Sequence, residues 1–254
     1  VIMQVVYAVF FFLLGSVLAS FYGVLATRLP ENKSIIAPRS HCDSCNHPLS
    51  WWELIPILSY ILLRGKCHKC HKHIPITGFI VEIFMAIAFM FSYLYFGISY
   101  NFFVSLFLIS LFVLIFWTDI THMIILDSPL LITLIAVFFL KWYYFSLETA
   151  GLSLLNGLFL FLLMLAIGFL GKWMFKRDAL GGGDIKLAFL FGQILGIPHA
   201  LIALVLSTFL ALPYATFSLF HSEQREVPYG PFLIGALCIV FFFYDKFTYI
   251  VQLF

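Results

Sequence analysis

The sequence predicts an all-α integral membrane protein of about eight transmembrane helices, with one cytoplasmic loop domain between the first two. Hydrophobic residues make up 63% of the 254 residues and charged residues only 10%, whereas soluble domains have roughly 45–50% and about 25%. The apolar runs are continuous, which is typical of helices, because barrel strands would alternate at every second residue. The lysines and arginines are also concentrated in a few segments, and half of them lie in the loop after the first apolar run.

Eight apolar segments are long enough to be interpreted as helices. A span needs about 20 apolar residues, and fewer if it is tilted or re-entrant. The expected segments are 4–26, 79–97, 102–118, 124–145, 152–175, 185–197, 199–220 and 232–252. The sixth is short, and Gly196 with Pro198 separates it from the seventh. No small-residue cleavage site follows the first segment, so we expect a retained span rather than a signal peptide.

The charges predict the orientation of the chain. If the loop 27–78 is cytoplasmic and eight spans alternate, only Lys141 and Lys246 of the 14 Lys and Arg residues fall on the opposite side. We therefore expect a first transmembrane helix (1–26), a cytoplasmic loop domain (27–78) and a polytopic membrane domain (79–254). The net charge of +2 does not indicate nucleic-acid binding.

The polar loop carries two CxxC pairs, formed by Cys42, Cys45, Cys67 and Cys70. Four thiolates at this spacing can close a tetrahedral zinc site, because each pair supplies two ligands from one tight turn. Such a site leaves no open position, so the zinc would be structural. The alternatives are two dithiols without metal, or a nearby histidine in place of one cysteine. Between the pairs, the apolar stretch "WWELIPILSYILL" is expected to pack on the cysteine turns or to lie on the membrane surface.

Four acids lie at or near apolar segments, where an ionisable group is a candidate functional residue. These acids are Glu82, Asp119, Asp127 and Asp184. The predicted topology places Asp119 and Asp184 at the cytoplasmic ends of their helices, at similar depth. Two adjacent carboxylates share a proton at neutral pH, so one acts as an acid and the other as a base. This pair would suit an aspartic protease, although an interfacial Asp119 and a helix-capping Asp184 are the simpler alternatives.

The surroundings of the acids suggest supporting roles. Three glycines before Asp184 expose the backbone and would let an extended peptide approach closely; they are Gly181, Gly182 and Gly183. Lys186 follows in the same helix, and Asp127 is expected to cap the segment that begins beside Pro129. Glu82 is expected to pair with a loop lysine or to support the site.

These motifs together resemble one family. The stretch "GGGDIKL" is similar to the GxGD-type membrane aspartic proteases, and the two CxxC pairs narrow the resemblance to the bacterial type IV prepilin peptidases. The same holds for "ELIPILSYILLRGKC", "TDITHMIILD", "GGGDIKLAFLFGQILG" and "VPYGPFL" (227–233). The resemblance implies that Asp119 and Asp184 are catalytic and that the four cysteines form the zinc-type box. The compact loop "LPENKSIIAPRSHC" resembles members from Gram-positive competence systems.

The resemblance also implies the substrates and the setting. It implies cleavage of a short basic leader from prepilins or pseudopilins at the cytoplasmic face of the cell membrane. Many members then N-methylate the new amino terminus with S-adenosylmethionine. The chain departs from the family pattern in its first span, where "ASFYG" carries Ala19 and Gly23, and at Gly78, Phe79 and Leu126. These departures bear on methyl transfer rather than on the aspartates.

Two other classes remain as alternatives. A cation- or proton-coupled transporter with a metal-sensing cysteine box would use intramembrane acids, but it should show two related halves. A membrane scaffold that recruits partners through its zinc module would leave Asp184 and its glycines without a role. The pilin that is cleaved and the oligomeric state do not follow from the sequence.

Overall fold

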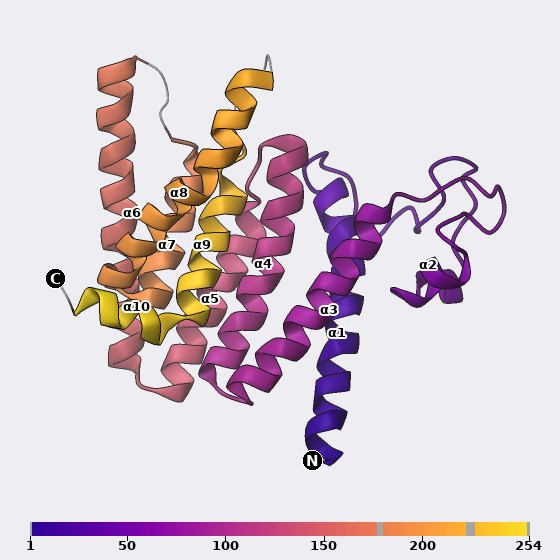
Figure 1. Cartoon of the computed structure of the whole chain (residues 1–254), viewed down its shortest axis with the longest axis horizontal. Coiled ribbons are helices and arrows are strands. Elements are labelled where there is room, and N and C mark those ends of the chain that lie inside the picture. The colour runs from indigo at the N-terminus through magenta and orange to yellow at the C-terminus, as the bar shows by residue number, and fades with distance from the viewer. Residues whose placement is uncertain (1, 177–179, 222–226, 253–254) are drawn as a thin grey trace. The chain divides into compact units, whose positions relative to one another are not determined.

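The computed structural model describes residues 2–176, 180–221 and 227–252, and its regular elements there are helices (Figure 1). They are α1 (Ile2–Arg28), the 3-10 helix η1 (Trp51–Leu54), α2 (Leu58–Leu62), α3 (Ile76–Phe96), α4 (Tyr100–His122), α5 (Asp127–Tyr144), α6 (Leu147–Phe175), α7 (Gly182–Leu195), α8 (Ile197–His221), α9 (Gly230–Phe242) and α10 (Tyr244–Val251). Arg177 and Arg225, two of the cations assigned to the cytoplasmic side, lie outside the described residues. The helices of the described residues confirm the expected all-helical membrane fold.

Six of the eight expected segments are helices long and apolar enough to cross a membrane, counted over the described residues. They are α1, α3, α4, α5, α6 and α8. The sixth expected segment is α7, whose 14 residues reach only about 21 Å. The last segment, 232–252, is divided into α9 and α10, because the chain turns at Phe243 before the polar residues Asp245 and Lys246.

The chain forms two compact units, Val1–Trp117 and Thr118–Phe254, so the division falls within α4. The expected domain boundaries at residues 26 and 78 stay predictions. In the first unit α1 packs along α3 (Figure 1). A Cβ atom at Gly15 would lie 2.6 Å from the Met85 carbonyl oxygen, so a glycine permits this close approach. Phe102 joins the two helices in a cluster with Ala8 and Tyr93.

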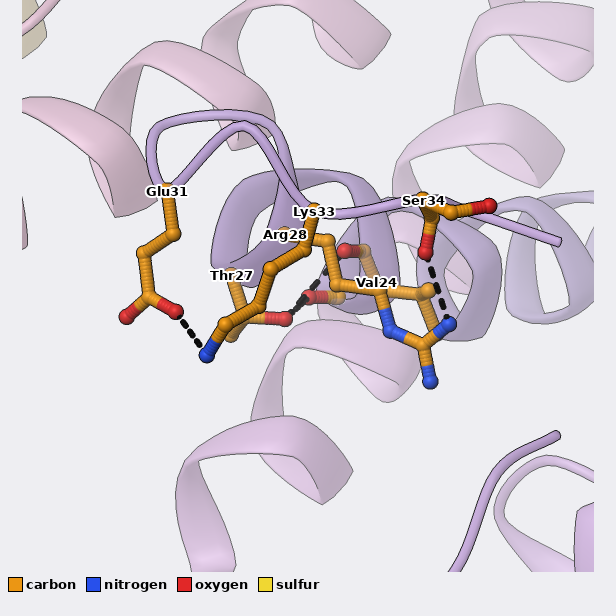
Figure 2. A network of polar contacts seen from close by, with 7 residues as sticks. Val24, Thr27, Arg28, Glu31, Lys33 and Ser34 are labelled. Atoms are coloured by element: carbon orange, nitrogen blue, oxygen red, sulfur yellow. Dashed lines mark hydrogen bonds and ion pairs between the residues drawn. The ribbon is translucent and has the colours of Figure 1, made fainter. Parts of the chain in front are cut away.

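A network of polar contacts follows the end of α1 (Figure 2). The Arg28 guanidinium donates to the Ser34 carbonyl oxygen at 3.0 Å, and Lys33 forms an ion pair with Glu31. Thr27 Oγ1 donates to the Val24 carbonyl oxygen at 3.2 Å. These contacts tie the last turns of α1 to the residues that follow it, and so they help to set the path of the chain into the polar loop.

In the second unit α6 lies along α7, and α8 lies along α9. The α6–α7 contact is very close, because a Cβ atom at Gly192 would lie 2.3 Å from the Asn156 carbonyl oxygen. Helix α5 contacts both α6 and α7. Helix α10 packs on α8, where His199 Nε2 and Thr248 Oγ1 are hydrogen-bonded at 3.0 Å. This packing holds α7 between its neighbours and thereby positions Asp184.

Candidate active site and metal cluster

The four cysteine sulfurs of the polar loop converge. The Sγ atoms of Cys42, Cys45, Cys67 and Cys70 all lie within 4.8 Å of one another. Cys42 Sγ lies 3.9 Å from Cys70 Sγ, and Cys45 Sγ lies 3.9 Å from Cys67 Sγ. A tetrahedral ion with Zn–S bonds of about 2.3 Å would separate its sulfurs by about 3.8 Å. The cluster therefore has the dimensions of a four-thiolate metal site.

Two turns with the same hydrogen bonds carry the cysteines. In the first, Cys42 N–H donates to the His47 carbonyl oxygen at 3.0 Å, and Asn46 N–H donates to the Cys42 carbonyl oxygen at 2.8 Å. In the second, 25 residues later, Cys67 N–H donates to Lys72 and His71 N–H donates back to Cys67, at 2.9 and 3.0 Å. Asn46 and His71 both adopt positive φ, 53° and 57°. The segments 40–49 and 65–74 are thus two copies of one cysteine turn, which we call the two knuckles.

The first knuckle also favours the thiolate form of Cys42. The backbone N–H groups of Ser44 and Cys45 lower the pKa of Cys42 to about 6, because hydrogen bonds to sulfur favour its charged form. Thiolates are the form that binds a metal ion. None of the loop histidines belongs to this cluster of four sulfurs; they are His41, His47, His68, His71 and His73.

The apolar stretch between the knuckles packs against them, as one of the two expected placements requires. Its helices η1 and α2 are short, and the ring of Trp52 contacts that of His68 edge-on at 5.3 Å. Glu82 on α3 accepts a hydrogen bond from the Ile57 N–H at 2.8 Å, just before α2. Glu82 therefore anchors this stretch in the first unit, whereas Asp119 and Asp184 belong to the second.

Asp119 lies in the last turn of α4 and is 6% exposed. Its Oδ2 atom accepts a hydrogen bond from the Gly230 N–H at 2.9 Å. Gly230 is the first residue of α9, whose early N–H groups have no partner within the helix. The positive end of α9 therefore faces the Asp119 carboxylate.

Asp184 lies in the first turn of α7, where Gly181 occupies the N-cap position. Its half-buried carboxylate interacts with the main chain of Gly181 and with the negative charge of Asp119. It also interacts electrostatically with Tyr229, the neighbour of Gly230. Asp184 is thus not the N-cap residue of α7, and the structure brings the two aspartates from α4 and α7 into one electrostatic environment.

The three glycines before Asp184 have different surroundings. A Cβ atom at Gly181 would lie 3.0 Å from Asp184 Oδ2, and one at Gly183 would lie 2.8 Å from the Ile125 Cβ atom. Around Gly182 nothing lies within 4 Å of such an atom. Gly182 therefore has open space beside it, whereas Gly183 packs closely on Ile125 and Gly181 lies beside the Asp184 carboxylate.

Lys186 and Asp127 are paired with each other. Lys186 Nζ donates to both carboxylate oxygens of Asp127, at 2.7 and 2.8 Å. Asp127 is the first residue of α5 and follows the N-cap residue Leu126, so the expectation that Asp127 caps this helix is wrong. Its carboxylate instead joins α5 to α7.

Sequence reasoning did not identify the start of α9 as part of the site. Tyr229 is its N-cap residue, and its hydroxyl is hydrogen-bonded to Ser207 Oγ at 2.6 Å. The segment "YGPF" before an apolar run carries the signal, because proline is common at the first position of a helix. That signal predicts where the helix begins. It does not predict that the first residue of the helix contacts Asp119.

Comparison with known proteins identifies the family. A model of the bacterial peptidase A24 N-terminal domain matches residues 13–96, and a model of the type IV leader peptidase family matches residues 106–216. A prepilin leader peptidase/N-methyltransferase of Bacillus subtilis is 36% identical over 199 residues, which cover 77% of each chain. The chain belongs to the type IV leader peptidase family. The expectation drawn from its motifs is confirmed.

Two further relatives carry the same name. That of Vibrio cholerae is 32% identical over 223 residues, covering 81% of this chain and 84% of the relative. That of Myxococcus xanthus is 33% identical over 192 residues, covering 74% of this chain. The match spans 56% of the length of the Myxococcus protein. No solved structure matches the chain.

Proposed function

We propose that this chain is a membrane aspartic endopeptidase that removes the leader from type IV prepilins or pseudopilins, with Asp119 and Asp184 as its catalytic residues. The observation that carries the proposal is the electrostatic interaction between these two carboxylates, one on α4 and one on α7. Each also interacts with a glycine main chain at a helix start, Gly230 or Gly181. Family membership and the names of the relatives supply the substrate class.

The mechanism follows from two carboxylates that share one proton. The ionised carboxylate removes a proton from a water molecule, which attacks the scissile carbonyl carbon, while the protonated one donates a hydrogen bond to the carbonyl oxygen. The tetrahedral intermediate then collapses as its C–N bond breaks, and a carboxyl group gives a proton to the leaving nitrogen. No covalent bond forms between enzyme and substrate. The open space at Gly182 gives an extended peptide backbone room beside Asp184.

The charge pattern supports a cytoplasmic position for this site. Asp119 lies in the last turn of α4 and Asp184 in the first turn of α7, and the positive-inside rule assigns both ends to the cytoplasmic side. A prepilin would lay its apolar helix in the bilayer and present its basic leader at the same boundary. Only there are the bond, the lipid and the attacking water all within reach.

Methyl transfer is a second activity that we propose for the chain, because the relatives are named for both activities. S-adenosylmethionine would supply the methyl group. The first unit has a pocket of about 780 Å³ whose wall includes Asp43, Glu82 and Trp117. This volume is in the range of ligand sites, and the carboxylates can accept hydrogen bonds from hydroxyl and amino groups. These residues therefore fit such a ligand.

We also propose that the metal of the four-cysteine cluster is zinc. A soft, all-thiolate tetrahedral set favours zinc, and the closed shell gives it a structural role. The ion would hold the two knuckles together in a loop that buries little apolar surface of its own.

Co-expression with a cognate prepilin tests the aspartyl mechanism. Asp119→Asn and Asp184→Asn should each abolish cleavage while the protein still inserts in the membrane. Asp245→Asn on α10 is the matched control and should cleave normally. Normal processing by either active-site variant would overturn the mechanism, and absence of cleavage by the wild-type chain would favour the transporter alternative.

A further inference from the structure

Polar contacts between α5 and α7 repeat at one interval in both helices. Asp127 on α5 pairs with Lys186 on α7, and seven residues further along each helix the Leu134 carbonyl oxygen accepts from Gln193 Nε2 at 2.9 Å. Seven residues are about two helical turns, so each pair of positions lies on one face of its helix. The two helices therefore run parallel and in register across these contacts.

Lys141 adds a third contact at the next interval of seven on α5. Its Nζ atom donates to the main-chain carbonyl oxygen of Gln193. Gln193 lies three residues before the C-cap Gly196, where helix carbonyls lack partners within the helix. A cation at this end also complements the negative end of the α7 dipole. Lys141 thus caps α7 from a neighbouring helix.

The Gln193 side chain is polar although it is fully buried between helices. The residue is 0% exposed, and its Oε1 atom has no hydrogen-bond partner. A buried polar atom without a partner destabilises a fold, so an apolar residue would suit packing better. In coiled coils, a single buried polar residue can specify one register over others at a cost in stability.

The register of α7 decides where Asp184 stands. A slip of one residue along α5 would move the Asp184 carboxylate by about 1.5 Å and turn it by roughly 100° about the α7 axis. A misplacement of about 1 Å can lower an enzyme's rate by roughly a hundredfold. Asp184 and Gln193 both belong to α7. The contacts of Gln193 with Leu134 and Lys141 on α5 therefore hold the helix that carries the aspartate.

We propose that Lys141 and Gln193 are positioning residues that fix the register of α7 on α5 and, through it, the placement of the Asp184 carboxylate beside Asp119. The effect on catalysis rests on the proposed peptidase function. The physical contact between the two helices is a separate claim and has its own measurement.

The experiment uses the full-length protein in nanodiscs with a prepilin substrate, and it measures kcat and KM per folded enzyme together with Tm. Gln193→Leu should lower kcat by about tenfold or more with KM within about twofold, while Tm stays level or rises because the unpartnered Oε1 atom is gone. Lys141→Met should lower kcat in the same way, and Lys141→Arg should restore most of it by keeping a cationic donor.

Thr133→Val is the matched control. Thr133 is buried on α5, but its hydroxyl bonds to the Pro129 carbonyl oxygen of the same helix. Its kcat per folded enzyme should equal that of the wild type even if Tm falls. The proposal is overturned if Gln193→Leu and Lys141→Met behave like this control, losing activity only in proportion to the folded fraction.

Amide hydrogen exchange keeps the two claims apart. Lys141→Met should speed exchange in the last turn of α7, whereas exchange in α3 should not change. If the wild-type chain cleaves no prepilin but exchange in α7 responds, the proposed function fails and the register contact stands. If exchange in α7 does not respond, the contact itself is refuted.

Discussion

The Gly230 N–H donates to Asp119 Oδ2 at 2.9 Å, although the two residues are 111 positions apart in the sequence. The contact brings the positive end of α9 to a carboxylate at the end of α4. This hydrogen bond depends on the position of the turn before α9. The hydrogen bond between the Tyr229 hydroxyl and Ser207 on α8 stabilises that turn.

We therefore expect Tyr229→Phe and Ser207→Ala to have matching effects. Each removes the same hydrogen bond, which contributes about 0.5–1.5 kcal/mol to folding, and each loosens the α9 start that faces Asp119. Cleavage assays and thermal unfolding of both single variants and of the double variant measure this. The double variant should be little worse than either single one; additive losses would show that the bond does not couple them.

Alanine substitutions of the glycines should separate packing from substrate access. Gly181→Ala places a methyl group 3.0 Å from Asp184 Oδ2 and should lower kcat by displacing the carboxylate. Gly182→Ala meets no atom of the protein within 4 Å, so it should leave Tm unchanged and raise KM if the substrate backbone passes there. Measurements of kcat, KM and Tm for the two variants test both expectations. An unaltered kcat in Gly181→Ala would contradict the first expectation.

Loss of one ligand should remove the metal. Wild-type protein should contain about one zinc per chain by elemental analysis, and Cys42→Ser and Cys67→Ser should lose it to the same degree, because the knuckles are equivalent. Unfolding of the loop should precede any change in kcat. Cys238→Ala in α9 is the control and should retain full zinc. An active, metal-free wild-type preparation would show that zinc is dispensable.

The contact between α6 and α7 should be sensitive to a single methyl group. Gly192→Ala would place its Cβ atom 2.3 Å from the Asn156 carbonyl oxygen, so the helices must separate, and the free energy of unfolding should fall by about 1–3 kcal/mol. Gly151→Ala on α6 meets no atom within 4 Å and should be neutral or stabilising by up to about 1 kcal/mol. Thermal unfolding in one detergent compares the two.

The sequence alone predicted the features that depend on local spacing. The CxxC pairs specify their own turns, so the meeting of Cys42 and Cys70 follows once the loop closes. Apolar runs specify helices wherever the membrane requires satisfied backbone groups. The helices, the cysteine cluster and the family could therefore be predicted from local patterns.

Contacts between segments far apart in the chain could not be predicted from the sequence. In the sequence Lys141 is a single charge near the end of an apolar run, and its bond to the Gln193 carbonyl depends on how α5 and α7 pack. In the same way, nothing in "GGGD" distinguishes Gly182, which faces open space, from Gly183, which packs on Ile125. Such roles depend on the relative placement of helices, which no local pattern encodes.

The two knuckles have a consequence for how the metal-binding loop could be assembled from simpler parts. Residues 40–49 and 65–74 each contribute two sulfurs through the same backbone bonds. A ten-residue peptide of either segment therefore holds half of a coordination shell, and two identical peptides would complete it around one ion. The intervening 15 residues would then serve as a tether that raises the effective concentration of one half near the other.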